Sequence, residues 1–178
     1  MADRAVVRAQ RNPCVTIRTP AAVAMTPLDA VRRRYRHHAW AGSTLLGVID
    51  THPAPEALRP FAHALAADRV WHRRLSGAPS DGLAIWPDLD AAGCRALLDE
   101  TTRDWRTYLD GLDDLHGTVA YQNSRGEPFE SAVADVLDHV LLHGAHHRGQ
   151  ANAALRAAGA TPRALDLIFW ARSGEPPA

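Results

Sequence analysis

The segment from Ser131 to Ala158 constrains the fold most, because its apolar residues and histidines recur at helical spacing. Residues three or four positions apart lie on one face of a helix, and a single face can be followed through this segment. That face carries, in order, Val136, Val140, His143, His147, Ala151 and Ala154. Gly159 and Pro162 follow, as expected just beyond a helix end. We therefore expect one long helix over about residues 131–158 that turns two histidines towards the interior.

Three further segments have helical periodicity and recognisable ends. The first begins after Met25, where Thr26 can cap a helix, Pro27 suits its first position and Asp29 fits a capping box. The second covers about residues 55–76, with Gly77 as its stop, and the third covers about residues 89–111. The apolar face of the third helix is predicted to consist of Leu97, Leu98, Trp105 and Leu109.

The long connection before the last long helix has a different character. Residues 117–129, GTVAYQNSRGEPF, place β-favouring residues before a polar turn, which predicts a short hairpin or an extended crossover. A short helix within residues 163–172, RALDLIFWAR, should pack Leu165, Ile168, Phe169 and Trp170 on the other helices. These elements predict an all-α fold, a four-helix bundle with a hairpin or crossover before its last long helix and a short C-terminal helix.

The first 24 residues have no helical period, and they contain two prolines and four arginines against one aspartate. We expect residues 1–24 to form a disordered or loosely attached tail, and Met25 is a second candidate for the initiating residue. Residues 25–178 are then one helical domain, because 178 residues of which 46% are hydrophobic suffice for one domain with a real core.

The charges argue against a nucleic-acid partner. Twenty basic residues, all of them arginine, balance twenty acidic ones. The segment RRRYRHH, residues 32–38, places Arg32 and Arg36 on one helical face and Arg33 on another, which is typical of a solvated helix. DNA binding with a steep salt dependence would contradict this interpretation.

The sequence also predicts a cytoplasmic protein. It has no run of about 18 apolar residues and no apolar signal segment, so neither a membrane helix nor a secretory leader is expected. Cys14 and Cys94 have no CxxC spacing, and neither looks catalytic.

His143 and His147 form the best candidate pair of metal ligands. Residues at i and i+4 stack on one helical face, so two ring nitrogens can reach one ion at about 2.1 Å. His139 lies beside the face that carries His143 and His147, roughly 12 Å along the helix axis from His147. We expect it to contact either the substrate or the ligand histidines rather than the ion. His146 is expected at the surface, and Arg148 and Gln150, which face away from the pair, are expected in helix packing or a subunit contact.

A third ligand must come from another helix, and His63 is the candidate. It shares a face with Ala66, Ala67 and Val70, which would let the ring project inwards. Three imidazoles would leave a divalent ion at least one open position, as in catalytic sites. Gly144 and Gly149 each cost a helix about 1 kcal/mol, which suggests that something approaches the backbone there. Buried histidines can also be hydrogen-bonded core residues, so the spacing leaves both interpretations open.

The segment LDHVLLHGAHHRGQANAALRAAGATPRALDLIFW resembles the C-terminal signature of the DinB/YfiT-like superfamily. The resemblance covers about residues 25–172, and FAHALAADRVWHRRL, with His63 ahead of Trp71, is similar to the first-ligand helix of that superfamily. The matching signature positions are His139, His143, His147, Arg148, Gly149, Gln150, Leu155, Arg156, Gly159, Pro162 and Asp166.

The resemblance implies a four-helix bundle, often a homodimer, in which His63, His143 and His147 bind a divalent metal such as Zn²⁺ or Ni²⁺. Related branches are thiol-dependent transferases and isomerases that use low-molecular-weight thiols, and others are metal-dependent hydrolases. We therefore expect transfer of a low-molecular-weight thiol to an electrophilic small molecule. Hydrolysis by metal-activated water and non-catalytic binding of a metal or ligand remain alternatives. Thiol transfer is favoured because no carboxylate base accompanies the histidines, with Asp138 and Glu130 pointing elsewhere or lying turns away. The tryptophans Trp40, Trp71 and Trp170 are expected in the core or in pocket walls.

Overall fold

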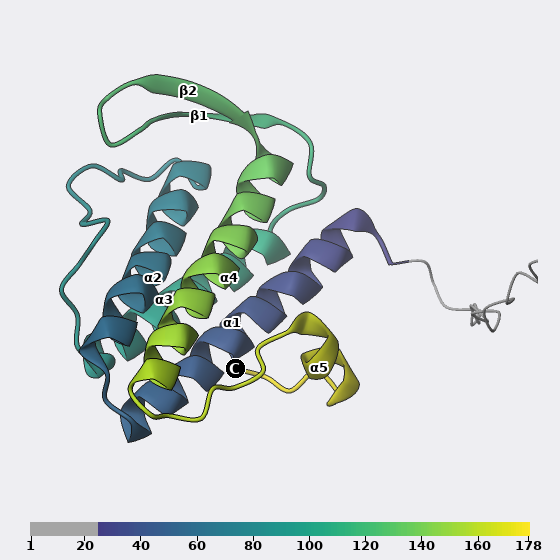
Figure 1. The fold of residues 1–178 in the computed structure, drawn as a ribbon. Helices are drawn as coiled ribbons and strands as arrows, with labels where there is room; N and C mark the ends of the chain where they lie inside the picture. Colours follow the sequence, from purple (N-terminus) through teal and green to yellow (C-terminus); the bar gives the residue numbers. More distant parts are fainter. Residues whose placement is uncertain (1–24) are drawn as a thin grey trace, which may run out of the picture.

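The computed structural model describes residues 25–178, which are mostly helical and include one small sheet (Figure 1). The expected four long helices are present, and the all-α class is confirmed. In chain order the elements are α1 (Pro27–Thr51), α2 (Pro55–Leu75), α3 (Ala91–Asp110), β1 (Thr118–Gln122), β2 (Pro128–Ala132), α4 (Val133–Ala157) and α5 (Leu167–Arg172).

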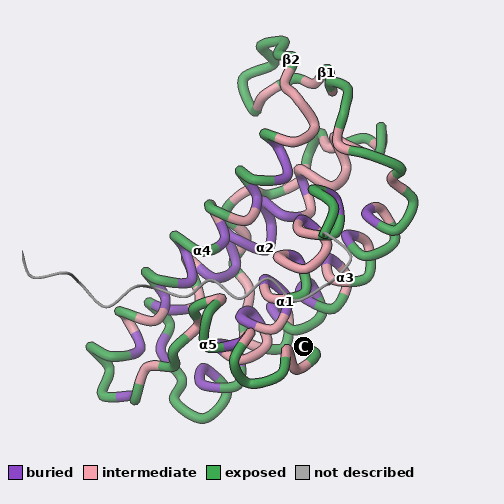
Figure 2. Tube along the Cα trace, turned by 90° about the vertical axis from the view of Figure 1, so that its right-hand side faces the viewer, coloured by how far each residue is buried: buried purple, intermediate pink, exposed green. Residues whose placement is uncertain are grey.

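The long helices bury their small and apolar faces against one another. Helix α2 packs most extensively on α4, α3 contacts both α1 and α2, and α1 also contacts α4. Figure 2 shows the buried positions along the inner faces of these helices. One core cluster contains Leu45, Phe61 and Leu155, and a second contains Tyr35, Trp105 and Leu137. The face predicted for α3 is buried as expected, because Leu97, Leu98, Trp105 and Leu109 all belong to these clusters.

The hairpin between α3 and α4 extends further than the sequence indicated. Strands β1 and β2 pair antiparallel, with Tyr121 opposite Phe129 and Thr118 opposite Ala132. Ser131 and Ala132 therefore belong to β2, and α4 begins at Val133 rather than at Ser131. Strand pairing satisfies their backbone groups in place of a first helical turn. In Figure 1 the hairpin lies beyond one end of α2 and α4.

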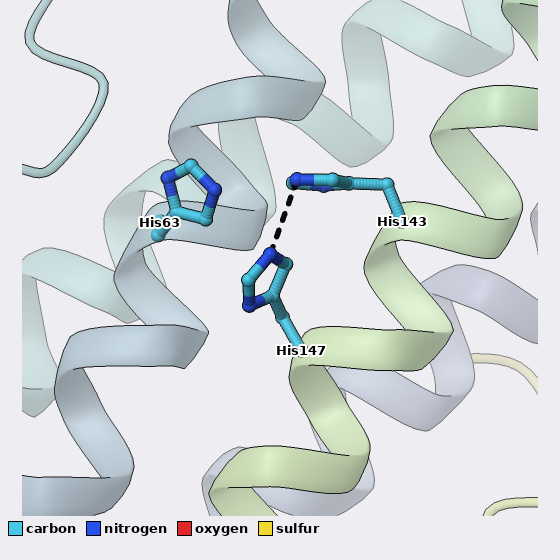
Figure 3. Close-up of side chains that lie close together, drawn as sticks. All are labelled: His63, His143 and His147. Atoms are coloured by element: carbon cyan, nitrogen blue, oxygen red, sulfur yellow. Dashed lines mark hydrogen bonds between the residues drawn. The ribbon is translucent and has the colours of Figure 1, made fainter.

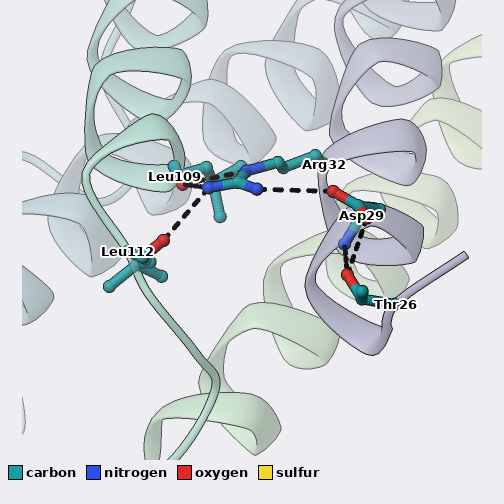
Figure 4. A network of polar contacts seen from close by, with 5 residues as sticks. All are labelled: Thr26, Asp29, Arg32, Leu109 and Leu112. Carbon is teal, nitrogen blue, oxygen red and sulfur yellow. Dashed lines mark hydrogen bonds and ion pairs between the residues drawn. The ribbon is translucent and has the colours of Figure 1, made fainter.

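The start of α1 is fixed by the capping residues that the sequence indicated (Figure 4). The backbone N–H of Asp29 donates to Thr26 Oγ1 at 3.1 Å, and Thr26 Oγ1 donates to Asp29 Oδ2 at 2.7 Å. One turn later, Arg32 donates to the backbone oxygens of Leu109 and Leu112 at the end of α3. The Leu109 carbonyl is in the last turn of α3 and that of Leu112 lies two residues beyond the helix, so Arg32 joins the start of α1 to the end of α3.

Helix α5 is shorter and less buried than predicted. Its Trp170 side chain is buried, but Ile168 and Phe169 are exposed, so the expectation that both pack on the other helices is wrong. A helix of six residues cannot turn all of its apolar positions to one side. Leu165, just before α5, packs partly buried against the core.

Two further expectations concern the N-terminal segment and membrane-spanning helices. The tail predicted for residues 1–24 lies outside the described residues. Within residues 25–178, no helix combines the length and the apolar character that a membrane crossing requires.

Candidate metal centre

Helices α2 and α4 bring His63, His143 and His147 together (Figure 3). One ring nitrogen of each residue can be chosen so that all three lie within 4.8 Å of one another. The ring centroid of His63 lies 5.0 Å from that of His143 and 4.5 Å from that of His147. The three predicted residues therefore form one cluster that could hold a metal ion, and its third member comes from a second helix, as the sequence indicated.

Hydrogen bonds orient two of the three rings. His63 Nδ1 lies 2.7 Å from the backbone oxygen of Ile85, and His147 Nδ1 lies 2.7 Å from Gln150 Oε1. Both partners are acceptors, so each Nδ1 carries the proton and each Nε2 keeps a free lone pair. Metal-binding histidines commonly have such an acceptor on the nitrogen that does not bind the ion. The Nε2 atoms of His143 and His147 face each other at 3.1 Å.

The cluster fits a small divalent ion. Two nitrogens that share a tetrahedral ion at about 2.1 Å lie roughly 3.4 Å apart, and the 3.1 Å separation of the two α4 nitrogens is close to that value. The Nδ1 atom of His143 is buried without a hydrogen-bond partner within the described chain, so this ring, unlike those of His63 and His147, has no acceptor on its outer nitrogen there. Three imidazole nitrogens are a donor set suited to Zn²⁺ or Ni²⁺.

Burial keeps the two α4 histidines of the cluster, His143 and His147, neutral. It is the largest cause that lowers the pKa of His143 to about 4, with further contributions from His147, His63 and His139. Burial also lowers the pKa of His147, although its hydrogen bond to Gln150 acts in the opposite direction. Both rings are therefore unprotonated near neutral pH, and only an unprotonated imidazole nitrogen can bind a metal.

A tryptophan that the sequence did not single out covers one side of the cluster. The rings of Trp86 and His63 stack at 3.7 Å with an interplanar angle of 6°. Arg59 lies 5.5 Å above the Trp86 ring, and the Trp86 side chain is 53% exposed. Its only sequence signal was an aromatic residue in a loop of glycine, proline and aspartate, outside any apolar period. Trp86, on the loop between α2 and α3, therefore covers one face of the His63 ring.

Three other residues of the segment 139–150 lie outside the cluster: His139, His146 and Gln150. His139 is exposed, with its ring 5.4 Å from His143 and 5.3 Å from Trp71, and it does not belong to the three-residue cluster. His146 is exposed, as expected, and lies 3.0 Å from the Gln150 amide nitrogen. The expectation that Gln150 faces away from the pair is wrong, because its side chain turns back along α4 to His147.

The sequence profile of the DinB family matches residues 33–176, a span that contains all three clustered histidines. The chain belongs to the DinB family. Among curated proteins, Protein DinB of Bacillus subtilis (strain 168) is 23% identical over 150 residues, which cover 74% of this chain and 87% of that protein. No solved structure gives a significant match.

In this DinB-family chain, a buried polar group of Arg148, His38 and Asp68 joins α4, α1 and α2. Arg148 Nη1 donates to His38 Nδ1 at 3.1 Å, so His38 Nε2 carries the proton that it donates to Asp68 Oδ2 at 2.7 Å. Arg148 therefore has a helix-packing role, between α4 and α1. Burial lowers its pKa to about 10, with Asp68 acting in the opposite direction, so the guanidinium stays charged at neutral pH.

The sequence indicated that something approaches the backbone closely at Gly144, and the side chains of His38 and Arg148 do so. A methyl group on Gly144 would lie 2.3 Å from His38 Cε1 and 2.9 Å from Arg148 Nη1. Only a glycine leaves room for the His38 ring at this position. Gly149, by contrast, would place a methyl group with nothing from residues 25–178 within 4 Å, so no part of the described chain makes such an approach there.

The two carboxylates considered as bases lie elsewhere. Asp138 Oδ1 is 3.0 Å from Arg34 Nη2 on α1, and Glu130 accepts from Thr118 Oγ1 across the hairpin. Asp68 is buried and bonded to His38. Within residues 25–178, the candidate metal cluster consists of histidines alone.

Proposed function

We propose that this chain is a cytoplasmic metal-dependent enzyme that transfers a low-molecular-weight thiol to an electrophilic small molecule. In this proposal His63, His143 and His147 bind one divalent ion, Zn²⁺ or Ni²⁺. The observation that carries the proposal is the convergence of three histidines from two helices, with the proton of His63 and of His147 held on the outer nitrogen by Ile85 and Gln150. Membership of the DinB family supports it.

The protein side chains supply geometry rather than acid–base chemistry. Three ligands leave a small divalent ion at least one position for an exogenous molecule. A bound ion would lower the pKa of a thiol that occupies this position, so that the thiol is ionised near neutral pH. Packing and hydrogen bonds hold the imidazoles in place before the ion arrives, so little ordering has to accompany binding.

The surroundings favour thiol transfer over hydrolysis. A hydrolytic site usually pairs its activated water with a general base, commonly a carboxylate. Asp138 and Glu130 are bonded to Arg34 and Thr118. A thiolate that is already ionised needs no such base.

We also propose that α1 to α4 form the four-helix bundle of the superfamily and that two chains form a homodimer. Two large apolar side chains support a subunit contact, because Leu142 on α4 is 71% exposed and Phe129 on β2 is 48% exposed. Contiguous exposed apolar patches commonly mark an interface, and the proposal requires that these two side chains lie within one such patch. Light scattering of the wild type and of Leu142→Lys tests this, with a dimer expected only for the wild type.

The activity is tested with a panel of thiols and electrophilic small molecules, assayed with the metal-loaded wild type, His147→Ala and His146→Ala. Thiol adducts should form with the wild type and with His146→Ala, because His146 is exposed and outside the cluster. They should form at the background rate with His147→Ala. Turnover of ester or amide substrates without any thiol would support hydrolysis instead. Background rates for all three proteins throughout the panel would contradict an enzymatic role and favour a metal-binding protein.

A further inference from the structure

Aromatic side chains lead from the metal cluster to the hairpin. The ring centroid of His139 lies 5.4 Å from that of His143 on α4 and 5.3 Å from that of Trp71 on α2. The Trp71 ring in turn lies 5.0 Å from the ring of Tyr121 on β1. Rings at such distances are in direct packing contact. We name His139, Trp71 and Tyr121 the aromatic strip, which α4, α2 and β1 bring together beside the cluster.

The residues of the strip remain partly in contact with solvent. His139 is exposed, and Trp71 and Tyr121 are half-buried. Trp105 in the core, by comparison, is 3% exposed. An aromatic residue at the surface forgoes part of the stabilisation that full burial would give it. Three such residues in continuous contact therefore form a surface that a solute can reach.

Arg74 holds two rings of the strip together. Its guanidinium carbon lies 4.6 Å from the Trp71 ring centroid and 4.8 Å from that of Tyr121, as in cation–π contacts. Arg74 also donates to the backbone oxygen of Gln122 on β1, at 3.0 Å. The hairpin is thereby tied to α2, and the two rings are positioned before any ligand binds. Binding to such a preformed surface costs less entropy than binding to a mobile one.

The partly exposed member of the metal cluster lies next to the strip. His63 and His147 are buried, whereas His143 is only half-buried. Trp86 stacks on one face of the His63 ring at 3.7 Å and covers the cluster there. His139 is the strip residue beside His143, with 5.4 Å between the two ring centroids. A molecule that reaches the cluster past His143 therefore comes into contact with the strip.

We propose that the aromatic strip binds the electrophile, and that the enzyme acts on electrophiles with a flat aromatic body. This substrate class presupposes the proposed thiol transfer, because the thiol sulfur must react at the cluster. A ring packed on His139 and Trp71 lies beside His143, so a reactive carbon joined to that ring by a short linker reaches the cluster. An aromatic ligand gains edge-to-face or offset contacts with these side chains that a saturated ring of the same size does not make.

Two unreactive amides test the binding: N-benzylacetamide and N-(cyclohexylmethyl)acetamide differ only in the aromaticity of the ring. Each is titrated into full-length protein that has been loaded with Zn²⁺ and labelled with ¹⁵N-tryptophan, and the Trp71 indole signal is assigned with Trp71→Phe. The benzyl compound should shift this signal saturably and bind about three- to tenfold more tightly than the cyclohexyl compound, because it gains aromatic contacts. No saturable shift, or equal or tighter binding of the cyclohexyl compound, would overturn the proposal.

Two histidine variants locate the binding surface. His139→Ala should abolish the preference for the benzyl compound, and His139 is exposed, so its removal leaves the core intact. His146→Ala is the matched control, because His146 is exposed on the same helix but has its ring 5.0 Å from that of His147 and is not part of the strip. This control should bind the benzyl compound as the wild type does. A preference that survives in His139→Ala, or that is lost in His146→Ala alone, would overturn the assignment to the strip.

Thiol transfer is assayed with the reactive counterparts, N-benzyl- and N-(cyclohexylmethyl)chloroacetamide. In both, the thiol sulfur bonds to the chloromethyl carbon, chloride leaves with the bonding electron pair, and the thiol proton passes to solvent. The wild type should convert the benzyl compound with the higher kcat/KM, and His139→Ala should convert both equally. Equal kcat/KM values in the wild type would overturn the aromatic specificity and leave thiol transfer intact. Background rates for both, alongside the predicted amide binding, would contradict thiol transfer and the role of the strip in it, although the aromatic binding would stand.

Discussion

His147 Nδ1 donates a hydrogen bond of 2.7 Å to Gln150 Oε1, three residues further along α4. This bond fixes the ring so that Nε2 points towards His143 and His63. Gln150 is therefore the residue through which the helix itself orients a candidate metal ligand.

Removal of this bond should weaken metal binding without removing a ligand. Loss of a hydrogen-bond partner behind a metal ligand typically lowers metal affinity by about 10- to 100-fold. We expect a decrease of this size for Gln150→Ala and a smaller one for Gln150→Glu, which keeps an acceptor. Competition with a chelator of known affinity measures both, and His116→Ala, at an exposed loop position beyond the end of α3, is the control. Equal affinities for Gln150→Ala and wild type would show that packing alone positions His147.

The two glycines of α4 should respond in opposite directions to replacement by alanine. Gly144→Ala should destabilise the metal-free protein by about 1–3 kcal/mol, because the added methyl group displaces His38 from its bonds to Asp68 and Arg148. Gly149→Ala should stabilise it by about 0.5–1 kcal/mol, since the methyl group meets no atom of the described chain within 4 Å. Urea unfolding of the two variants measures both changes. A similar change in both would contradict the close approach of His38.

The metal-free protein should lose stability in acid. Burial is the main cause that lowers the pKa of His37, of His72 and of His143, in the last case to about 4. The unfolded chain therefore takes up protons as the pH falls below 6.5, whereas the folded chain does so only at lower pH. The stabilisation is complete above pH 6.5 and is lost as the pH falls towards about 4.

Urea midpoints at several pH values between about 7.5 and 4 measure this loss. His143→Asn should flatten part of the slope, because the variant lacks the group with the lowered pKa. A midpoint that stays constant over this range would contradict the assignment of neutral, buried rings.

The helices and the histidine cluster were predictable because local rules determine both. Thr26 and Asp29 form the cap that the sequence indicated, and the i, i+4 spacing brought His143 and His147 together. His63 followed from the small residues on its helical face. Each helical face needs only the geometry of one helix, whereas the meeting of His63 with His143 and His147 also needs α2 to pack on α4.

The missed features depend on contacts between elements. Ser131 and Ala132 could have continued a helix, and only pairing with β1 places them in a strand. The approach of His38 to Gly144 depends on how α1 crosses α4, and the stacking of Trp86 on His63 depends on a loop without periodicity. Gln150 lies off the histidine stripe, and its role depends on a side-chain rotamer that the spacing does not determine.

Metal content per chain tests the central claim most directly. Elemental analysis is made of wild type, His63→Ala, His147→Ala and His146→Ala, each purified without chelator or histidine tag and then loaded with Zn²⁺ or Ni²⁺. We predict about one ion per chain in the wild type and in His146→Ala, and a loss of the ion in both cluster variants, because three ligands from two helices share one site. Wild-type protein that takes up neither metal would show that His63, His143 and His147 are hydrogen-bonded core residues, and it would contradict the account.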